Sequence, residues 1–215
     1  MKKVLLIVVF LMVVSSCTLL PWVKDVNNIM DYLPDIKEGD VFEYDVSVYS
    51  ISEYYDEYSE EWVVDTIDYS LEYFDTCKEV EISDEKAYYL FEGYFGYVFI
   101  KERGIAAFTF DGTYNEDEDV VFLKTPVEIE NDWDFVENGD IKLEIKKINE
   151  IYEKDELRFE DVIVIEMSYS DFNGEYTCEL YYSPSGGIIR EYQKSIDNSG
   201  TYESKKELVS IERED

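Results

Sequence analysis

Acidic side chains dominate the residues of this sequence that could take part in chemistry. The 215 residues include 51 Asp and Glu, 19 Lys and Arg, and no histidine. Without histidine, Ser-His-Asp and Cys-His catalysis and the usual histidine-based zinc and iron sites are excluded. Paired carboxylates could hydrolyse glycosides, but with 51 acids such pairs arise by chance, so we assign no catalytic pair. We expect a protein that is not an enzyme, with a carboxylate-based hydrolase as an alternative.

Calcium is the metal to consider, because it takes oxygen ligands. The densest acidic loop is "DGTYNEDED" (111–119), whose candidate ligands are Asp111, Asn115, Asp117 and Asp119. The loop lacks the ligand order and the central glycine of an EF-hand. It is therefore a weak calcium candidate, and no cofactor is expected.

Aromatic and acidic side chains are interleaved in "SVYSISEYYDEYSEEW" (47–62). Rings beside carboxylates suit a cationic or sugar ligand. The alternative is an edge hairpin whose acids prevent edge-to-edge aggregation, and we favour this alternative. The candidate ligand-facing aromatics are Tyr49, Tyr54, Tyr55, Tyr58 and Trp62.

Cys77 and Cys178 are the two cysteines in the body of the chain. In an exported protein such a pair could form a disulfide. The alternative is two separate, half-buried thiols. Spacing along the chain does not choose between them, because it does not show whether the two residues lie close together.

The elements that must position these side chains are strands. Tyr, Phe, Val and Ile dominate the body, which is typical of pleated sheets. In "DVFEYDVSVYSI" (40–51) apolar and polar residues alternate, as they do in a strand with one buried face. Similar short runs, separated by turn signals such as 172–175 and 183–187, predict an antiparallel all-β body of about ten strands. Val23–Leu33 precedes it as a short helix or a tether.

A weak internal repeat divides this body. "LPDIKEGDVFEY" (33–44) is similar to "TPVEIENDWDF" (125–135), and each ends in two aromatic residues spaced two apart. Aromatics at this spacing lie on one face of a strand. The repeat predicts a β domain at 33–213 with duplicated halves at 33–124 and 125–213. The alternative is chance similarity between strands of like composition.

The N-terminus reads "MKKVLLIVVFLMVVSSC". Lys2 and Lys3 precede the apolar run Val4–Val14, which fits a signal peptide and is shorter than the roughly 20 residues that span a bilayer. Val14-Ser15-Ser16-Cys17 resembles a bacterial lipobox. The resemblance implies removal of signal peptide 1–16 and lipidation of Cys17 with acyl chains such as palmitate. Two or more chains anchor a protein stably, with residues 17–32 as tether or short helix.

The body also resembles a largely uncharacterised group of exported bacterial lipoproteins. "YLPDIKEGDVFEYDV" is similar to their opening, where a Pro and a Gly-Asn-x-Trp-x-Tyr core begin the first strand. Here Asp40 replaces the Asn and Phe42 the Trp. "YYSPSGGIIREY" (181–192) resembles their closing pattern, so the likeness extends over 32–212. It implies a strongly curved antiparallel sheet, similar to the half-barrels of lipoprotein-carrier proteins, with an apolar groove.

Net charge limits the partners of this body. The charge of −32 becomes −34 when residues 1–16, which hold Lys2 and Lys3 but no acid, are removed. Such a body repels nucleic acid and anionic headgroups. We therefore expect a membrane-anchored cell-envelope protein, on the inner or the outer membrane, that acts as a binding or interaction module for an unknown envelope protein. The alternative is a carrier that holds an apolar ligand or lipid in the concave face of its sheet.

Overall fold

The computed structural model describes residues 25–56, 58–92, 95–110, 115, 120–134, 141–170 and 174–213. Within them the protein is all-β, as predicted, with twelve antiparallel strands and one short 3₁₀ helix, η1 (Ile29–Tyr32). The strands are β1 (Val41–Asp56), β2 (Glu61–Ile82), β3 (Lys86–Phe91), β4 (Phe95–Ile100), β5 (Ile105–Phe110), β6 (Val120–Lys124), β7 (Asp132–Asp134), β8 (Lys142–Lys154), β9 (Leu157–Ser170), β10 (Gly174–Ser183), β11 (Gly187–Asp197) and β12 (Gly200–Glu212). None of the described helices is long and apolar enough to cross a membrane.

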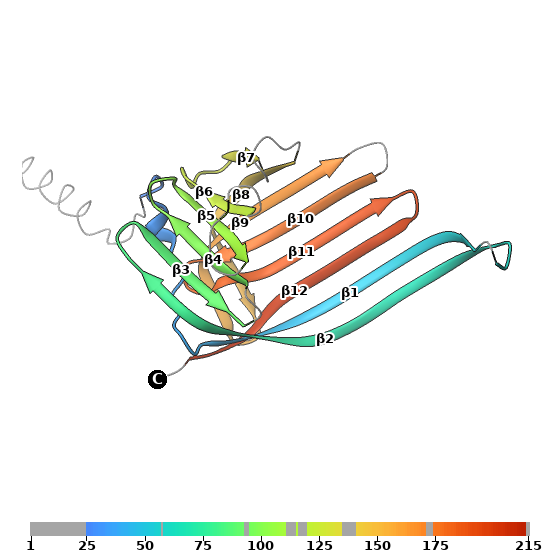
Figure 1. Ribbon diagram of the computed structural model, residues 1–215, viewed down its shortest axis with the longest axis horizontal. Coiled ribbons are helices and arrows are strands. Elements are labelled where there is room, and N and C mark those ends of the chain that lie inside the picture. The colour runs from blue at the N-terminus through green and yellow to red at the C-terminus, as the bar shows by residue number, and fades with distance from the viewer. Residues whose placement is uncertain are drawn as a thin grey trace, which may run out of the picture.

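The strands form one strongly curved sheet that nearly closes on itself (Figure 1). Its order is β6-β5-β4-β3-β2-β1-β12-β11-β10-β9-β8-β7, so strands β1 and β12 pair in the middle and β6 and β7 form the two edges. The Trp133 indole N–H on β7 donates a 2.7 Å hydrogen bond to the Val121 carbonyl on β6, so these two edges of the sheet lie close together. The predicted number of about ten strands was low because β6 and β7 have only five and three residues, too few for an alternating pattern.

Alternation along β1 sets the two faces of the sheet. Phe42 and Tyr44 are buried on the concave side, which we call the inner face, whereas Asp45 points to the outer face. Short strands β3–β6 curve over the inner face of β8–β11 at one end of the molecule (Figure 1). The rings of Phe99, Phe122 and Tyr182 meet there at centroid distances of 5.5–6.4 Å. Such edge and tilted contacts add about 0.5–1.5 kcal/mol each to the burial of the rings.

The segment before β1 packs on this core. The Asn28 side chain caps η1 by accepting a 3.3 Å hydrogen bond from the Met30 amide. Ile29 and Tyr32 are buried, and the Tyr182 hydroxyl donates a hydrogen bond to the Tyr32 carbonyl. The predicted short helix therefore exists as a single four-residue turn, and its residues belong to the body and not to a free tether.

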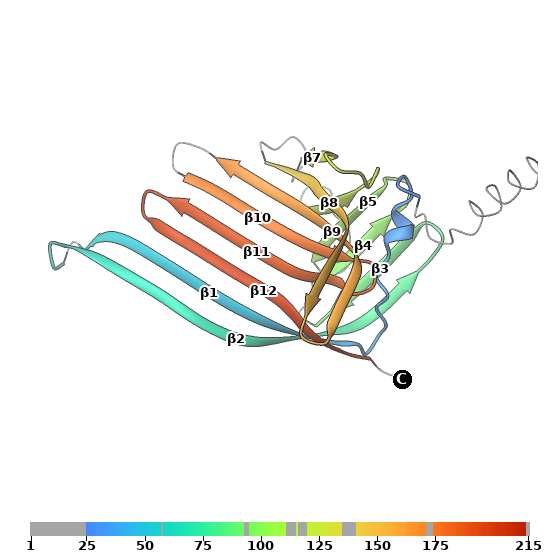
Figure 2. The same cartoon turned by 180° about the vertical axis from the view of Figure 1, so that it is seen from behind.

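Two long hairpins extend from the core. In Figure 1 the β1–β2 hairpin projects furthest to the right. Only 77–82 of β2 pair with β3, so over 61–74 β2 pairs with β1 on one side and with no described strand on the other. Figure 2 shows the second hairpin, β8–β9, bending back across the sheet. Its tip is fixed to the outer face by Lys154, which lies 2.9 Å from Asp45 and 3.5 Å from Glu207.

Candidate functional site

A cavity of about 290 Å³ lies on the inner face, where β4–β6 stand opposite β8–β12. We call it the concave cavity. Its volume is close to the lower end of the about 300–1,000 Å³ typical of small-molecule pockets. It is lined by Tyr44, Asp75, Phe95, Tyr97, Phe108, Val120, Phe122, Leu143, Ile165, Met167, Tyr176, Cys178, Leu180, Ile188, Glu191, Gln193 and Lys206.

Strand register accounts for the apolar floor of this cavity. Cys178 stands opposite Met167, and Leu180 opposite Ile165, on neighbouring strands β10 and β9. Residues two apart on each strand share a face, so all four side chains point to the inner face. The floor is therefore a continuous apolar surface.

Aromatic rings form the opposite wall. Phe108 stacks on Phe122 with ring centroids 4.6 Å apart, and Phe95 lies 5.3 Å from Phe108. These rings come from β4, β5 and β6, three adjacent strands whose inner faces meet at this end of the sheet. A rigid aromatic wall opposite an apolar floor suits a flat or elongated hydrocarbon group.

One side of the concave cavity is charged. Glu191 on β11 stands directly opposite Lys206 on β12. The Lys206 ammonium lies over two rings, 4.1 Å from the centroid of Tyr44 and 4.6 Å from that of Tyr73. These cation–π contacts hold the ammonium where it has lost much of its water. Burial lowers the pKa of Lys206, and the nearby carboxylates of Asp75 and Glu191 oppose that shift.

Asp75 completes this charged side. Only 7% of the residue is exposed, and its Oδ1 atom has no hydrogen-bond partner in the described structure. Burial raises the pKa of Asp75 to about 6, and Lys206 partly offsets this effect. At neutral pH the group is therefore largely a carboxylate with one oxygen unsatisfied, an arrangement that costs free energy unless a donor reaches that oxygen.

The other polar groups of the cavity are neutral. Burial holds the pKa values of the Tyr44 and Tyr97 hydroxyls well above the usual range. Tyr44 donates its proton to the Ile188 carbonyl at 3.2 Å. Burial also raises the pKa of the Cys178 thiol to about 12. A protonated thiol is a poor nucleophile, so Cys178 contributes apolar surface rather than covalent chemistry.

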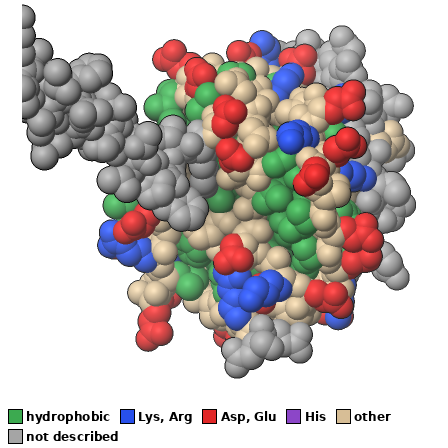
Figure 3. Space-filling model, turned by 90° about the vertical axis from the view of Figure 1, so that its left-hand side faces the viewer, with side chains coloured by type: hydrophobic (Ala, Val, Ile, Leu, Met, Phe, Trp, Pro, Cys, Tyr) green, Lys and Arg blue, Asp and Glu red, His purple; other side chains and the backbone are tan. Residues whose placement is uncertain are grey.

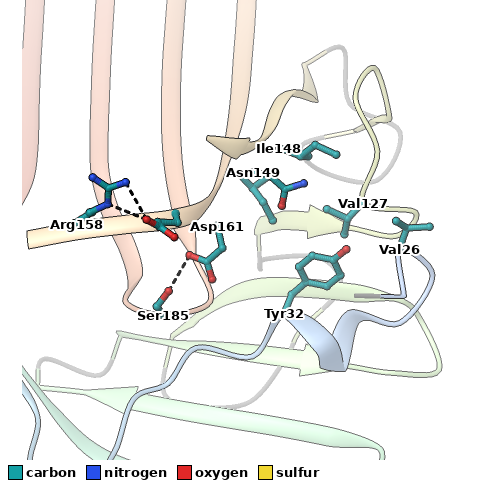
Figure 4. A pocket seen from close by; sticks show the side chains of 10 residues that line it. Val26, Tyr32, Val127, Ile148, Asn149, Arg158, Asp161 and Ser185 are labelled. Carbon is teal, nitrogen blue, oxygen red and sulfur yellow. Dashed lines mark hydrogen bonds and ion pairs between the residues drawn. The ribbon is translucent and has the colours of Figure 1, made fainter. Parts of the chain in front are cut away.

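A second, more polar cavity of about 750 Å³ lies between the N-terminal segment and β8–β9 (Figure 4). Four of its polar side chains, those of Arg158, Glu160, Asp161 and Ser185, are already hydrogen-bonded. Asp161 accepts hydrogen bonds from Ser183 and Ser185, at 2.5 and 2.8 Å, and Arg158 is bonded to Glu160 at 2.9 Å. Because these groups are already hydrogen-bonded, a ligand would gain less from bonding to them than from bonding to the unsatisfied oxygen in the concave cavity.

The five aromatics proposed from the sequence as ligand-facing do not come together in a pocket. Tyr49, Tyr54, Tyr55, Tyr58 and Trp62 are all exposed on the β1–β2 hairpin, and none lines either cavity. Tyr55 and Trp62 form a cross-strand pair, with ring centroids 5.8 Å apart. These rings therefore take no part in either cavity, because no strand of the described part of the chain lies opposite this stretch of the hairpin.

The cysteine and calcium hypotheses have separate outcomes. Cys77 and Cys178 are both free thiols, the first buried and the second half-buried, so the disulfide alternative is not realised. Asp111, Asp117 and Asp119 lie outside the described residues, and Asn115 is exposed. Among the residues that are described, no cluster of three or more acids or cysteines could hold a metal. The lipobox, including Cys17, also lies outside the described part.

Sequence reasoning missed the residues that do line the concave cavity. Tyr44 was predicted to lie on the buried face of a strand. Asp75, Glu191 and Lys206 were not singled out, because they are three of the many charged residues in the sequence. Each is a charged residue at an inward position of a strand, and that signal could have singled them out. Acidic side chains elsewhere are spread over the surface, as on the end of the molecule drawn in Figure 3.

No family model matches the chain, and no curated protein matches it significantly. The chain is similar to a solved structure from Bacteroides fragilis, described as an exported protein with a YmcC-like fold, at 12% identity and a TM-score of 0.43. It is also similar to one from Parabacteroides distasonis, described as a lipoprotein, at 13% identity and a TM-score of 0.37. Each comparison covers 84% of this chain and 98% of the other. Similarity this low says nothing about the ligand or the activity of this chain.

Proposed function

We propose that the protein is a lipid-anchored, non-enzymatic binding protein of the cell envelope that holds a small, largely apolar ligand in the concave cavity. The observation that supports this most directly is the cavity itself. It joins an apolar floor on β8–β10 to an aromatic wall on β4–β6, with a few polar groups on one side. This is the composition of sites that enclose small molecules. Its location on the concave inner face of the sheet distinguishes it from a flat surface patch for a protein partner.

The anchoring part of the proposal rests on Val14-Ser15-Ser16-Cys17. Cells fed a radiolabelled fatty acid should incorporate label into the wild-type protein. Cys17→Ala should abolish incorporation, whereas the matched variant Cys178→Ala should retain it. Label in the Cys17→Ala variant would contradict lipidation at this residue.

The binding part is tested by native mass spectrometry of residues 18–215, purified without detergent. This fragment contains every strand and the whole core of the described structure. We expect a bound small-molecule mass in the wild type. Met167→Trp, which fills the floor of the cavity, should remove that mass. Ile196→Trp, on the outer face of β11, should keep it.

A bare chain mass in all three proteins, together with no binding of added apolar probes, would contradict the proposed function. Equal retention by the Met167→Trp and Ile196→Trp variants would place the ligand outside the concave cavity.

A second candidate is a protein-interaction module that uses the β1–β2 hairpin. The observation in its favour is the row of exposed apolar side chains along the open edge of β2, which includes Trp62, Val64 and Ile67. Open, apolar edges are sites of strand addition. A photo-crosslinking amino acid at Trp62 should then capture an envelope protein in cells, and the same group at Ile129, an exposed residue outside the hairpin, should not.

A further inference from the structure

The charges that line the concave cavity do not balance. Its lining contains two acids, Asp75 and Glu191, and one base, Lys206. A further acid, Glu92, is close enough to Asp75 to act on it electrostatically. The side chains on the charged side of the cavity are therefore one positive charge short of balance, in a chain whose net charge is already −32.

Lys206 does not neutralise either acid by direct contact. No described carboxylate oxygen lies within 4.0 Å of its ammonium, whose close contacts are the rings of Tyr44 and Tyr73. Glu191 already accepts a hydrogen bond from the Gln193 side-chain amide. Asp75 Oδ1 is the group that has no partner, although the residue is more than nine-tenths buried and lines the cavity.

A ligand group that complements the charged side of the concave cavity must donate a hydrogen bond to Asp75 and carry a positive charge. A carboxylate or phosphate would add a third negative charge beside two acids, and only Lys206 would favour it. A hydroxyl could donate to Asp75 but would leave the charge unbalanced. A protonated amine supplies both, and charge-assisted hydrogen bonds are the stronger kind.

We propose that the concave cavity binds a small apolar amine, whose ammonium group donates a hydrogen bond to Asp75 Oδ1. Its hydrocarbon part lies between the rings of Phe95 and Phe108 and the side chain of Met167. The two acids, Lys206 and the ligand then form a neutral cluster of four charges. This inference rests on the proposed function and adds the chemical class of the ligand.

The volume limits the size of such an amine. About 290 Å³ is near the minimum for a small-molecule site. It accommodates a short alkyl chain or a single ring, and it is too small for a whole membrane lipid. The cavity is thus suited to a small amphiphile.

The test is calorimetric titration of residues 18–215 at neutral pH with three probes of equal chain length: hexylamine, hexan-1-ol and hexanoate. We expect hexylamine to bind about tenfold or more tightly than the other two. Asp75→Asn should weaken hexylamine binding by about tenfold or more and change hexan-1-ol binding by less than about threefold. The matched control is Asp68→Asn, which removes an exposed acid from the outer face of the hairpin and should change neither.

Glu191→Gln provides a second test of amine binding that does not depend on whether the Asp75 variant folds. It removes one negative charge from the same side and should also weaken hexylamine selectively. Tightest binding of hexanoate, or equal binding of all three probes, would overturn the amine assignment and leave the apolar cavity in place. Binding of none of the probes, with no mass retained in native mass spectrometry, would instead reject the proposed function.

Discussion

Strand β2 passes through two regions that use similar residues in opposite ways. At its C-terminal end, Asp75 and Cys77 are buried against the opposing strands. Along 61–74 most residues are exposed on both faces, including Trp62, which is 68% exposed. The difference is what lies opposite: Asp75 and Cys77 face the concave core, where β2 passes from pairing with β1 to pairing with β3, whereas the hairpin end pairs with β1 alone and has no described layer opposite. A strand pattern therefore determines which side chains share a face, and the layer opposite determines whether that face is buried.

The comparison also separates two kinds of aromatic cluster. Rings around the concave cavity contact several partners each, and Phe122 alone lies within 6.2 Å of Tyr97, Phe99, Phe108 and Tyr182. On the hairpin, Tyr55 and Trp62 contact only each other among the ring pairs of the described residues. The first cluster should stabilise the fold and shape a site. The second should be nearly independent of both.

The largest expected effect is on stability. Phe122 is fully buried, so Phe122→Ala should lower the free energy of unfolding by about 3–5 kcal/mol. Tyr58 lies in the turn of the hairpin and is fully exposed. Tyr58→Ala should therefore change the free energy of unfolding by less than about 0.5 kcal/mol. Urea-induced unfolding of the two variants measures the difference. Similar losses in both would show that the hairpin supports the core after all.

The next effect depends on pH and concerns Asp75. Burial raises its pKa from the ordinary 3.8 to about 6, so the folded protein keeps this proton to a higher pH than the unfolded chain does. The associated stability is fully present below about pH 4 and is lost as pH rises to about 6, by up to about 3 kcal/mol. Besides burial, Lys206, Glu92 and a hydrogen bond with the Thr76 backbone act on Asp75. The titratable residues Tyr44, Tyr73, Tyr97 and Cys77 lie near it.

Asp75→Asn removes this titration. Relative to the wild type, the variant should gain stability between about pH 4 and 6, by up to about 3 kcal/mol, and keep that gain at neutral pH. Unfolding free energies across this pH range measure it, with Asp68→Asn as the control that should follow the wild type. A variant less stable than the wild type at neutral pH would mean that Asp75 has a partner that the geometry does not show.

A smaller effect is expected where the edges of the sheet meet. Trp133→Phe keeps an aromatic ring but removes the N–H that bonds to the Val121 carbonyl. The loss should be about 1–2 kcal/mol, because a half-buried acceptor is left without its donor. Hydrogen exchange should become faster in β6 and β7. Trp62→Phe, at an exposed position, should leave these strands unchanged, and equal effects from both variants would argue against a bond between the edges.

The smallest effect is at the cross-strand pair of the hairpin. Trp62→Ala should cost about 0.5–1 kcal/mol locally and speed hydrogen exchange in 52–64. It should leave the affinity for hexylamine unchanged, since Trp62 does not line the concave cavity. Weaker amine binding in this variant would show that the two regions are coupled.

Much of the fold follows from local chemistry that is readable along the chain. The alternation around Phe42 and Tyr44 predicted a strand with one buried face, and the turn at 183–187 separates β10 from β11 as expected. An all-β antiparallel sheet with strong curvature was predicted and is confirmed. Strand β7 was missed because three residues are too short to show a period.

The sequence by itself determined the composition of this protein: strands by alternation, an acidic surface by its 51 acids, and chemistry without histidine. Only the tertiary structure decided which residues surround a ligand site. Asp75, Glu191 and Lys206 come from β2, β11 and β12, so they meet only because β1 pairs with β12 in the middle of the sheet. Tyr54 and Trp62 have the aromatic character of Phe95 and Phe108, but no strand of the described residues curves over them. Pairing between distant strands is set by the whole chain, so no local pattern could place these groups together.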